Sequence, residues 1–182
     1  MVNIWSTISH IIGERCPLCG QPGGGLCEPC KLDLPKNHHG CPCCALPLPV
    51  DAVGETVCAD CQTRPPAFDQ ATVPLVYEHP IDDLISAFKY HHRLSLGRDL
   101  ADLLVSAVRG RESLPQLLIP IPMHRRGLRE RGFNQAAEIA RMLSARLGIP
   151  WSDAHLRRHN DGNRQRGLQR HRRLRNMKGR FS

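Results

Sequence analysis

The stretch CPLCGQPGGGLCEPC, residues 16–30, contains two pairs of cysteines, and two residues separate the members of each pair. The same spacing occurs twice more downstream, which gives four C-x-x-C pairs: Cys16/Cys19, Cys27/Cys30, Cys41/Cys44 and Cys58/Cys61. A turn with this spacing presents two thiolates, and a structural zinc ion takes four such ligands in a tetrahedron. The four pairs therefore predict two zinc ions, each held entirely by protein, which indicates a structural rather than a catalytic role.

The spacing leaves open which pairs share a zinc ion. Seven residues separate the first pair from the second, and thirteen separate the third from the fourth, so sequential pairing is the simplest arrangement. A crossed arrangement, in which the first pair joins the third and the second joins the fourth, fits the same spacings. His38 and His39 could replace a cysteine ligand, although eight paired cysteines already fill both sites.

The ninth cysteine, Cys43, lies inside the tetrapeptide CPCC at residues 41–44. Because Cys41 and Cys44 keep the spacing of the other pairs, we predict that they bind zinc and that Cys43 does not. A ligand role for Cys43 in place of Cys44 would leave only one residue between the two thiolates and would break the shared register.

The cysteine count also bears on the cellular compartment. The N-terminal segment 1–12 has neither the basic region nor the small-residue cleavage site of a signal peptide, and is typical of a short amphipathic helix or a frayed end. We therefore expect a cytoplasmic protein, where thiols stay reduced and an odd number of clustered cysteines favours metal over disulfides. No apolar run approaches the roughly 18 residues that a membrane-spanning helix needs.

Charge is distributed unevenly along the chain. Residues 1–123 carry 9 Lys and Arg against 13 Asp and Glu, whereas residues 124–182 carry 16 against 4, so the two parts have net charges of −4 and +12. The basic segment 155–182 alone has 10 Lys and Arg and one acid, and we expect it to be mobile. Such a region favours phosphate-bearing ligands or nucleic acid, with a solvated basic surface as the alternative.

The remainder of the sequence alternates between strand-like and helix-like segments. A linker containing two prolines, at 62–70, follows the cysteine module. Strands are expected at two apolar runs, 71–77 and 117–122, of which the second should be buried. Helices are expected at three segments with apolar residues at helical spacing, 81–90, 94–108 and 134–148. In the second of these helices the apolar face consists of Leu96, Leu100, Leu103, Leu104 and Ala107. This alternation predicts an α/β domain.

Two longer motifs resemble a known family. The stretch IPIPMHRRGLRERGFNQAAEIARML (119–143) reads as a strand that ends in Pro-x-Pro, a basic loop and a helix, and RQRGLQRHRRLRNMKGRF (164–181) follows it. Together with the cysteine module they closely resemble the ComF/GntX family, which is phosphoribosyltransferase-like and associated with competence for DNA uptake. The resemblance implies a double zinc ribbon at 13–66 and a phosphoribosyltransferase-like α/β domain at 67–182.

One part of the family pattern does not occur in this sequence. Family members continue with a strand that carries two adjacent acids and a turn rich in Thr and Gly, which hold the ribose and the phosphate of phosphoribosyl diphosphate. The acids of IDDLIS (81–86) lack such a turn, and VDAVGETV (50–57) lies inside the cysteine module. We therefore expect an incomplete, C-terminally truncated domain. Catalytic residues are not assigned, and magnesium and phosphoribosyl diphosphate are expected only where the missing motif is supplied.

The basic loop supplies the candidate phosphate or nucleic-acid contacts: Arg125, Arg126, Arg129, Arg131, Asn134 and Gln135. In a doubly wound sheet these residues would lie at the carboxyl ends of the strands, where ligands usually bind. A solvated loop is the alternative for the arginines, and a helix N-cap is the alternative for Asn134.

The resemblance implies a competence-type protein that acts on single-stranded DNA or with the proteins of the competence machinery. Two alternatives remain. One is a fragment of a phosphoribosyltransferase, and the other is a zinc-ribbon module that binds a protein partner through residues 1–66. The sequence does not indicate the oligomeric state.

Overall fold

The structure is a computed structural model, and it describes residues 15–51, 56–91, 93–109, 111, 113–159, 169 and 179–182. The chain forms two compact units, Met1–Glu112 and Ser113–Ser182. The first unit therefore holds the cysteine module together with two helices that the sequence analysis assigns to the second domain. The N-terminal segment 1–12 lies outside the described residues, and the boundary at residue 66 stays a prediction.

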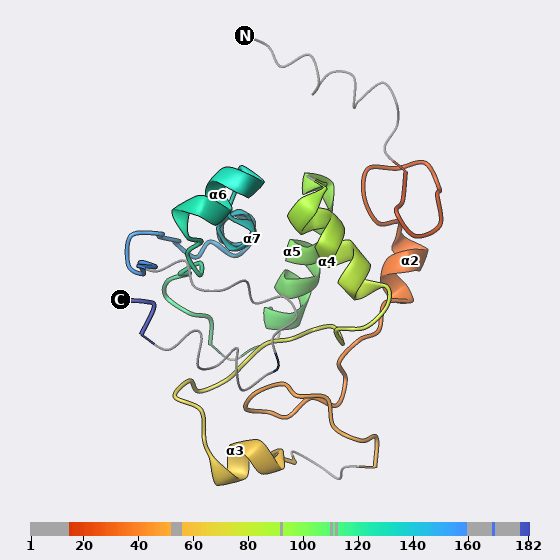
Figure 1. Ribbon diagram of the computed structural model, residues 1–182. Helices are drawn as coiled ribbons and strands as arrows, with labels where there is room; N and C mark the ends of the chain where they lie inside the picture. The colour runs from red at the N-terminus through yellow and green to blue at the C-terminus, as the bar shows by residue number, and fades with distance from the viewer. Residues whose placement is uncertain are drawn as a thin grey trace. The chain divides into compact units, whose positions relative to one another are not determined.

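The first cysteine segment folds as a bridged loop followed by one short helix (Figure 1). Arg15 and Pro22 form an isolated antiparallel bridge that closes the loop. Helix α2 (Glu28–Leu32) begins directly after Cys27, which is its N-cap residue. The loop thus carries the first cysteine pair, and the start of the helix carries the second.

The second cysteine segment repeats this plan. Gly40 and Pro47 form the antiparallel bridge, and helix α3 (Ala59–Thr63) begins directly after its N-cap residue Cys58. Each C-x-x-C pair therefore lies either in a tight loop or across a helix start, and both settings leave backbone N–H groups free to face a thiolate.

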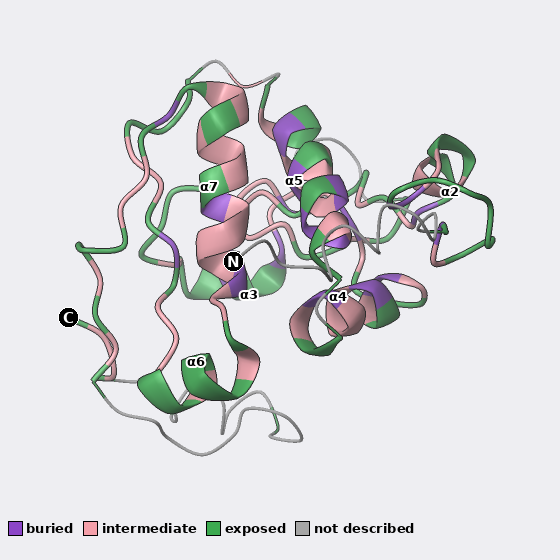
Figure 2. Ribbon diagram, turned by 90° about the horizontal axis from the view of Figure 1, so that it is seen from above, coloured by how far each residue is buried: buried purple, intermediate pink, exposed green. Residues whose placement is uncertain are grey.

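Two longer helices complete the first unit. Helix α4 (Ile81–Tyr90) and helix α5 (Leu94–Val108) have the bounds that the sequence predicts, and they pack against each other. Figure 2 shows the buried residues along both helices. The buried apolar side chains are Ile81, Leu84 and Phe88 on α4 and Leu96, Ala101 and Val105 on α5.

The buried face of α5 differs from the predicted one. Ala107 is exposed, and Leu100, Leu103 and Leu104 are only partly buried, whereas Asp99 is buried. The prediction assumed a single apolar stripe facing a single core. In the structure α5 is covered on more than one side, because α4 packs against it and the first cysteine segment contacts Asp99.

The predicted strand at 71–77 pairs with the chain upstream at a single position. Leu75 forms an antiparallel bridge with Lys36, and Val76 N–H donates to the Pro35 carbonyl at 2.8 Å. Leu75 is buried. This pairing ties the segment that leads into α4 to the connection between the two cysteine segments.

The second unit contains helix α6 (Arg125–Arg131) and helix α7 (Gln135–Leu147). The prediction of a basic loop before α7 is wrong for residues 125–131, which form α6 with His124 as the N-cap. Asn134 is the N-cap of α7, and its Oδ1 accepts a hydrogen bond from Ala136 N–H at 3.1 Å. The helix ends at Gly148, whose φ of 70° only glycine adopts at little cost. Cap, helix and stop are where the sequence predicts them.

The extended sheet of an α/β domain is not confirmed. Backbone pairing between segments in the described ranges is limited to isolated bridges, of which the one between Leu118 and Trp151 is parallel. The sequence predicts a buried strand at 117–122, but Ile119 and Ile121 are 45% and 57% exposed. That prediction is wrong, because one paired residue does not build a sheet that could bury alternate side chains.

The basic segment 155–182 is described only at its ends. Arg158 and Phe181 form an antiparallel bridge, and the Arg158 guanidinium lies 6.0 Å from the centre of the Phe181 ring. The predicted mobility of the segment concerns mostly residues outside the described ranges.

Candidate metal centres and phosphate-contact residues

The structure brings the eight paired cysteines together in two clusters. One cluster comprises Cys16, Cys19, Cys27 and Cys30, the other comprises Cys41, Cys44, Cys58 and Cys61, and in each the sulfur atoms lie within 4.8 Å of one another. The first and second pairs thus share one site and the third and fourth share the other. This is the sequential arrangement, and the crossed one does not occur.

The sulfur spacing fits zinc. A tetrahedral zinc ion with Zn–S bonds of about 2.3 Å places its sulfur ligands about 3.8 Å apart. Cys19 Sγ lies 3.5 Å from Cys27 Sγ, and Cys44 Sγ lies 3.6 Å from Cys58 Sγ. Four thiolates with this spacing leave no open position for a substrate or a water, so each site suits a structural ion.

Backbone amides stabilise one thiolate in each cluster. Burial alone would raise the pKa of Cys16, but hydrogen bonds from backbone N–H groups, chiefly those of Cys19 and Cys27, outweigh it and lower the pKa from 9.0 to about 6. Hydrogen bonds from the backbone, chiefly from Cys58 N–H at 3.4 Å, lower the pKa of Cys41 to about 6 as well. Each loop is therefore prepared for an anionic sulfur before any metal binds.

The pKa of the last cysteine of each cluster is raised rather than lowered. Hydrogen bonding to the Cys27 side chain raises the pKa of Cys30, and burial raises the pKa of Cys61. Neighbouring sulfurs cannot all carry negative charge without a cation between them. Zinc binding to such a cluster releases these protons, so zinc affinity falls as the pH is lowered.

The ninth cysteine lies beside the second cluster but outside it. Cys43 is half-buried and packs against the buried cysteines of that cluster, yet the four sulfurs that converge are those of the paired cysteines. Its backbone carbonyl accepts a hydrogen bond from Ala71 N–H at 2.7 Å. The geometry thus agrees with the spacing argument that Cys41 and Cys44 form the ligand pair.

A buried carboxylate holds the first cysteine segment to α5. Asp99 Oδ2 accepts a hydrogen bond from Leu26 N–H at 2.8 Å, and Asp99 Oδ1 lies 3.2 Å from Lys31 Nζ. A Cβ atom on Gly25 would lie only 2.5 Å from Asp99 Oδ2, so the loop can approach the carboxylate because it has glycine there. The sequence analysis missed this contact. The one sign of this contact in the sequence is that Asp99 follows Leu96 by three residues, which places an acid on the apolar face of the predicted helix.

The candidate phosphate-contact arginines differ in their surroundings. Arg125, Arg126 and Arg129 are exposed on α6. Arg126 Nε lies 3.1 Å from the Glu130 carboxylate, so part of its charge is balanced within the helix. Arg125 and Arg129 are four residues apart and therefore share one face of α6.

The other three candidates make contacts within the second unit. Arg131 Nη1 donates to Gln135 Oε1 at 3.0 Å, and Gln135 is buried. Asn134 donates from Nδ2 to the Ile121 carbonyl at 3.1 Å while its Oδ1 caps α7. The cap that the sequence analysis offers as an alternative for Asn134 is therefore present, and a ligand role for these residues stays a prediction.

Comparison with known proteins agrees with the geometry of the cysteines. Residues 8–62 match the family model of the double zinc ribbon domain. Over 163 residues the chain is 32% identical to competence protein F of Haemophilus influenzae, a match that covers 87% of this chain and 69% of that protein. The chain belongs to the ComF family.

Other members of the ComF family are similar along most of the chain. The DNA utilization protein YhgH of Salmonella typhimurium is 29% identical, and the protein of that name in Escherichia coli K12 is 27% identical. Each of these two matches covers 91% of this chain and 76% of the relative. No solved structure matches the chain significantly.

Most of the second ComF-like motif is outside the described residues. Six residues of this motif fit the family pattern. Gly179 and Phe181 are among the described residues, whereas Gln165, Leu168, Arg173 and Asn176 are not. Among the helices that the structure does describe, none combines the length and the apolar character needed to cross a membrane.

A third group of potential ligands lies at the start of α4. Ligand atoms of His79, Asp82 and Asp83 lie within 4.8 Å of one another, and His79 Nδ1 is 3.3 Å from Asp83 Oδ2. His79 and Asp83 are exposed. Exposed acidic groups of this kind are common without a metal, and we assign no ion to them.

Proposed function

We propose that this chain is a competence-type protein that takes part in the uptake or handling of single-stranded DNA, alone or with proteins of the competence machinery. The observation that carries the proposal is the similarity to competence protein F, which extends over 87% of the chain. The names of the YhgH relatives, which refer to DNA utilization, support it.

The charge distribution supports contact with nucleic acid. Residues 124–182 have a net charge of +12, and binding to a phosphate backbone derives much of its free energy from the release of counterions by Lys and Arg. Arg125 and Arg129 supply two of these charges on one exposed face of α6. We propose that this face contacts the strand.

A phosphoribosyltransferase-like fold for residues 67–182 is part of the proposal. The parallel bridge between Leu118 and Trp151 supports it, since the chain between them holds α6 and α7. Two parallel segments joined by a helical crossover are the unit from which such sheets are built. Within this proposal, magnesium and phosphoribosyl diphosphate would need the acidic, Thr- and Gly-rich motif, and no catalytic residue is assigned.

The two zinc ribbons have a structural part in this proposal. Their ligand sets are complete, so we propose that they stabilise the first unit without taking part in a reaction. Removal of zinc would then affect DNA binding only through the fold of that unit.

Fluorescence anisotropy with a labelled oligothymidylate tests the proposal on the zinc-loaded chain. We expect the logarithm of the binding constant to fall linearly with the logarithm of the salt concentration. Each lost phosphate contact lowers the slope by about 0.7, so the double variant Arg125→Gln, Arg129→Gln should lower it by about 1.4. Arg141→Gln is the matched control, because Arg141 is exposed on α7 and paired with Glu138 at 2.9 Å.

Two results would count against the proposal. If the folded, zinc-loaded chain does not bind the oligonucleotide at low salt, the chain has no direct DNA-binding role. If binding occurs but does not depend on salt, the phosphate backbone is not what it recognises.

A further inference from the structure

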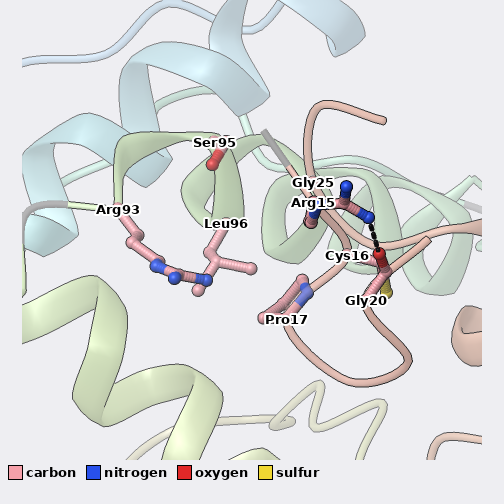
Figure 3. A pocket seen from close by; sticks show the side chains of 8 residues that line it. All are labelled: Arg15, Cys16, Pro17, Gly20, Gly25, Arg93, Ser95 and Leu96. Atoms are coloured by element: carbon pink, nitrogen blue, oxygen red, sulfur yellow. Dashed lines mark hydrogen bonds between the residues drawn. The ribbon is translucent and has the colours of Figure 1, made fainter. Parts of the chain in front are cut away.

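A hollow of about 340 Å³ lies within the first unit, between the loop of the first zinc ribbon and the start of α5 (Figure 3). It is lined by Arg15, Cys16, Pro17, Gly20, Gly25, Arg93, Ser95 and Leu96. Two of them, Arg15 and Arg93, are arginines that approach from different segments, and Cys16 is a ligand of the first zinc cluster. The hollow is far from the arginines of α6 in the sequence, and the proposed function does not use it.

Both arginines can offer charge to a ligand in this hollow. Arg15 Nη1 donates to the Gly20 carbonyl at 3.0 Å, which fixes one edge of the guanidinium and leaves its other N–H groups available. Arg93 is exposed, and no ion pair with another described residue occupies it. Figure 3 shows its side chain reaching toward Pro17 and Leu96.

One buried acid, Asp99, lies close to this hollow. Its carboxylate lies beside Gly25, accepts a hydrogen bond from Leu26 N–H and pairs with Lys31. Lys31 also pairs with Glu28 at 2.9 Å, so it balances the Asp99 carboxylate only in part, and an anion in the hollow depends on the two arginines to outweigh the remaining negative charge.

The start of α5 adds to the effect of the arginines. Ser95 lines the hollow, and its hydroxyl can donate to an anion. The first turn of this 15-residue helix contains no acidic residue, and its N-cap side chain makes no capping hydrogen bond. The first backbone N–H groups and the positive end of the helix dipole therefore favour negative charge at this end of the helix.

A second hollow, of about 470 Å³, adjoins the first and shares Pro17 and Arg93 with it. Its lining is more mixed, with Leu18, Leu84 and Ala87 beside His79, Asp83, His91 and Arg93. Because it contains an acid, it suits a neutral group better than a phosphate. A hollow with two arginines beside a hollow of mixed lining, with Arg93 shared between them, suits a nucleotide, with phosphate in the first and base or sugar in the second.

We infer that the hollow of Arg15, Arg93 and Ser95 binds one phosphodiester group of a single strand, with the neighbouring base or sugar in the second hollow. This inference rests on the proposed function, since it names a contact of the same strand. It assigns to the first zinc ribbon a part in binding as well as in stability.

The test uses the zinc-loaded full chain and a labelled oligothymidylate in anisotropy measurements. Arg93→Gln removes one contact without disturbing the ribbon, so we expect an affinity about three- to tenfold lower at low salt and a salt slope smaller by about 0.7. Arg98→Gln is the matched control. Arg98 is exposed on the same helix and lines neither hollow, and we expect its affinity to stay within about twofold of the parent chain.

Ser95→Glu provides an independent variant that should fold. An acid in the first turn of a helix is stabilising, but a carboxylate in this hollow would repel a phosphate. We expect Ser95→Glu to keep its zinc and its thermal stability while it weakens binding at least as much as Arg93→Gln.

The possible outcomes separate this inference from the proposed function. Unchanged binding by Arg93→Gln and Ser95→Glu, with binding still weakened by Arg125→Gln, Arg129→Gln, overturns the inference and keeps the function. Equal losses in Arg93→Gln and Arg98→Gln also overturn it, because they would show a general charge effect. Absence of binding by the parent chain overturns both.

Discussion

The two zinc ribbons have the same local plan but different surroundings. In the first, only Cys16 of the four clustered thiols is buried and Cys19 is exposed, whereas in the second three of the four are buried. The second cluster is surrounded by its own segment, through Leu48, Val57 and Cys43. The first depends on a separate element, because Asp99 of α5 holds its loop.

This difference shows what a C-x-x-C pair specifies and what it does not. The pair fixes two thiolates in a tight turn, and two pairs fix a zinc site, so the metal geometry follows from local sequence. What covers the site depends on residues far along the chain. Both ribbons therefore present the same four-cysteine site, while the second is covered mainly by its own segment and the first is completed by α5.

The largest expected effect is the loss of a ligand from either cluster. Cys58→Ser should lower the zinc content from about two ions per chain to about one and unfold the second ribbon, since a four-cysteine site couples roughly 10 kcal/mol or more of binding free energy to folding. Cys16→Ser should remove the other ion and loosen the first ribbon. Elemental analysis gives the zinc content, and limited proteolysis shows which segment is opened. A zinc content near zero in the freshly reduced parent chain would contradict the double-ribbon assignment.

A smaller effect is expected where the first ribbon meets α5. Asp99→Asn keeps the shape of the side chain but removes the ion pair with Lys31, which is partly exposed. We expect the free energy of unfolding to fall by about 1 to 3 kcal/mol, with both zinc ions retained. Urea denaturation measures this loss.

Asp102→Asn is the control for that experiment, because Asp102 is exposed on the same helix. Equal losses in the two variants would mean that the carboxylate at Asp99 has no special part in holding the ribbon.

Asp99 also illustrates how far the sequence could be interpreted. The ligand pairs, helices α4, α5 and α7 and the cap at Asn134 follow from local spacing and capping chemistry, so they could be predicted. The contact between Asp99 and the loop at Gly25 joins residues more than seventy positions apart, and no local pattern encodes it. The hollow beside Arg93 was missed for the same reason.

The strands show the reverse failure. The apolar run 117–122 has strand-like composition, yet a strand is buried only when partners and a covering layer exist. Among the described residues of the second unit, this run pairs with another segment only through the parallel bridge between Leu118 and Trp151. Composition alone therefore predicted burial for Ile119 and Ile121 that the structure does not provide.

The two loops also differ at one backbone position, with a still smaller expected effect. Each loop turns through a residue with positive φ, which is Gly20 at 75° in the first ribbon and Ala45 at 58° in the second. A residue with a side chain loses about 1 kcal/mol of stability in this backbone conformation. A Cβ atom on Gly20 would meet no neighbouring atom, so backbone strain alone determines the change in stability. We expect Gly20→Ala to lose about 1 kcal/mol and Ala45→Gly to gain up to about that amount. Thermal denaturation of the zinc-loaded variants measures both, and a gain in the first variant would contradict the argument.

The smallest expected effect concerns Cys43, the one cysteine outside the two ligand sets. Its sulfur packs against the second cluster without joining the four that converge, so Cys43→Ser should leave the zinc content at about two ions per chain. Serine is close to cysteine in shape, and we expect a stability change below about 1 kcal/mol at this half-buried position. Cys44→Ser, one residue along, should instead remove an ion. The opposite pattern, with zinc lost from Cys43→Ser and kept in Cys44→Ser, would mean that the second ribbon uses a different register from the first and that the two ribbons do not share one plan.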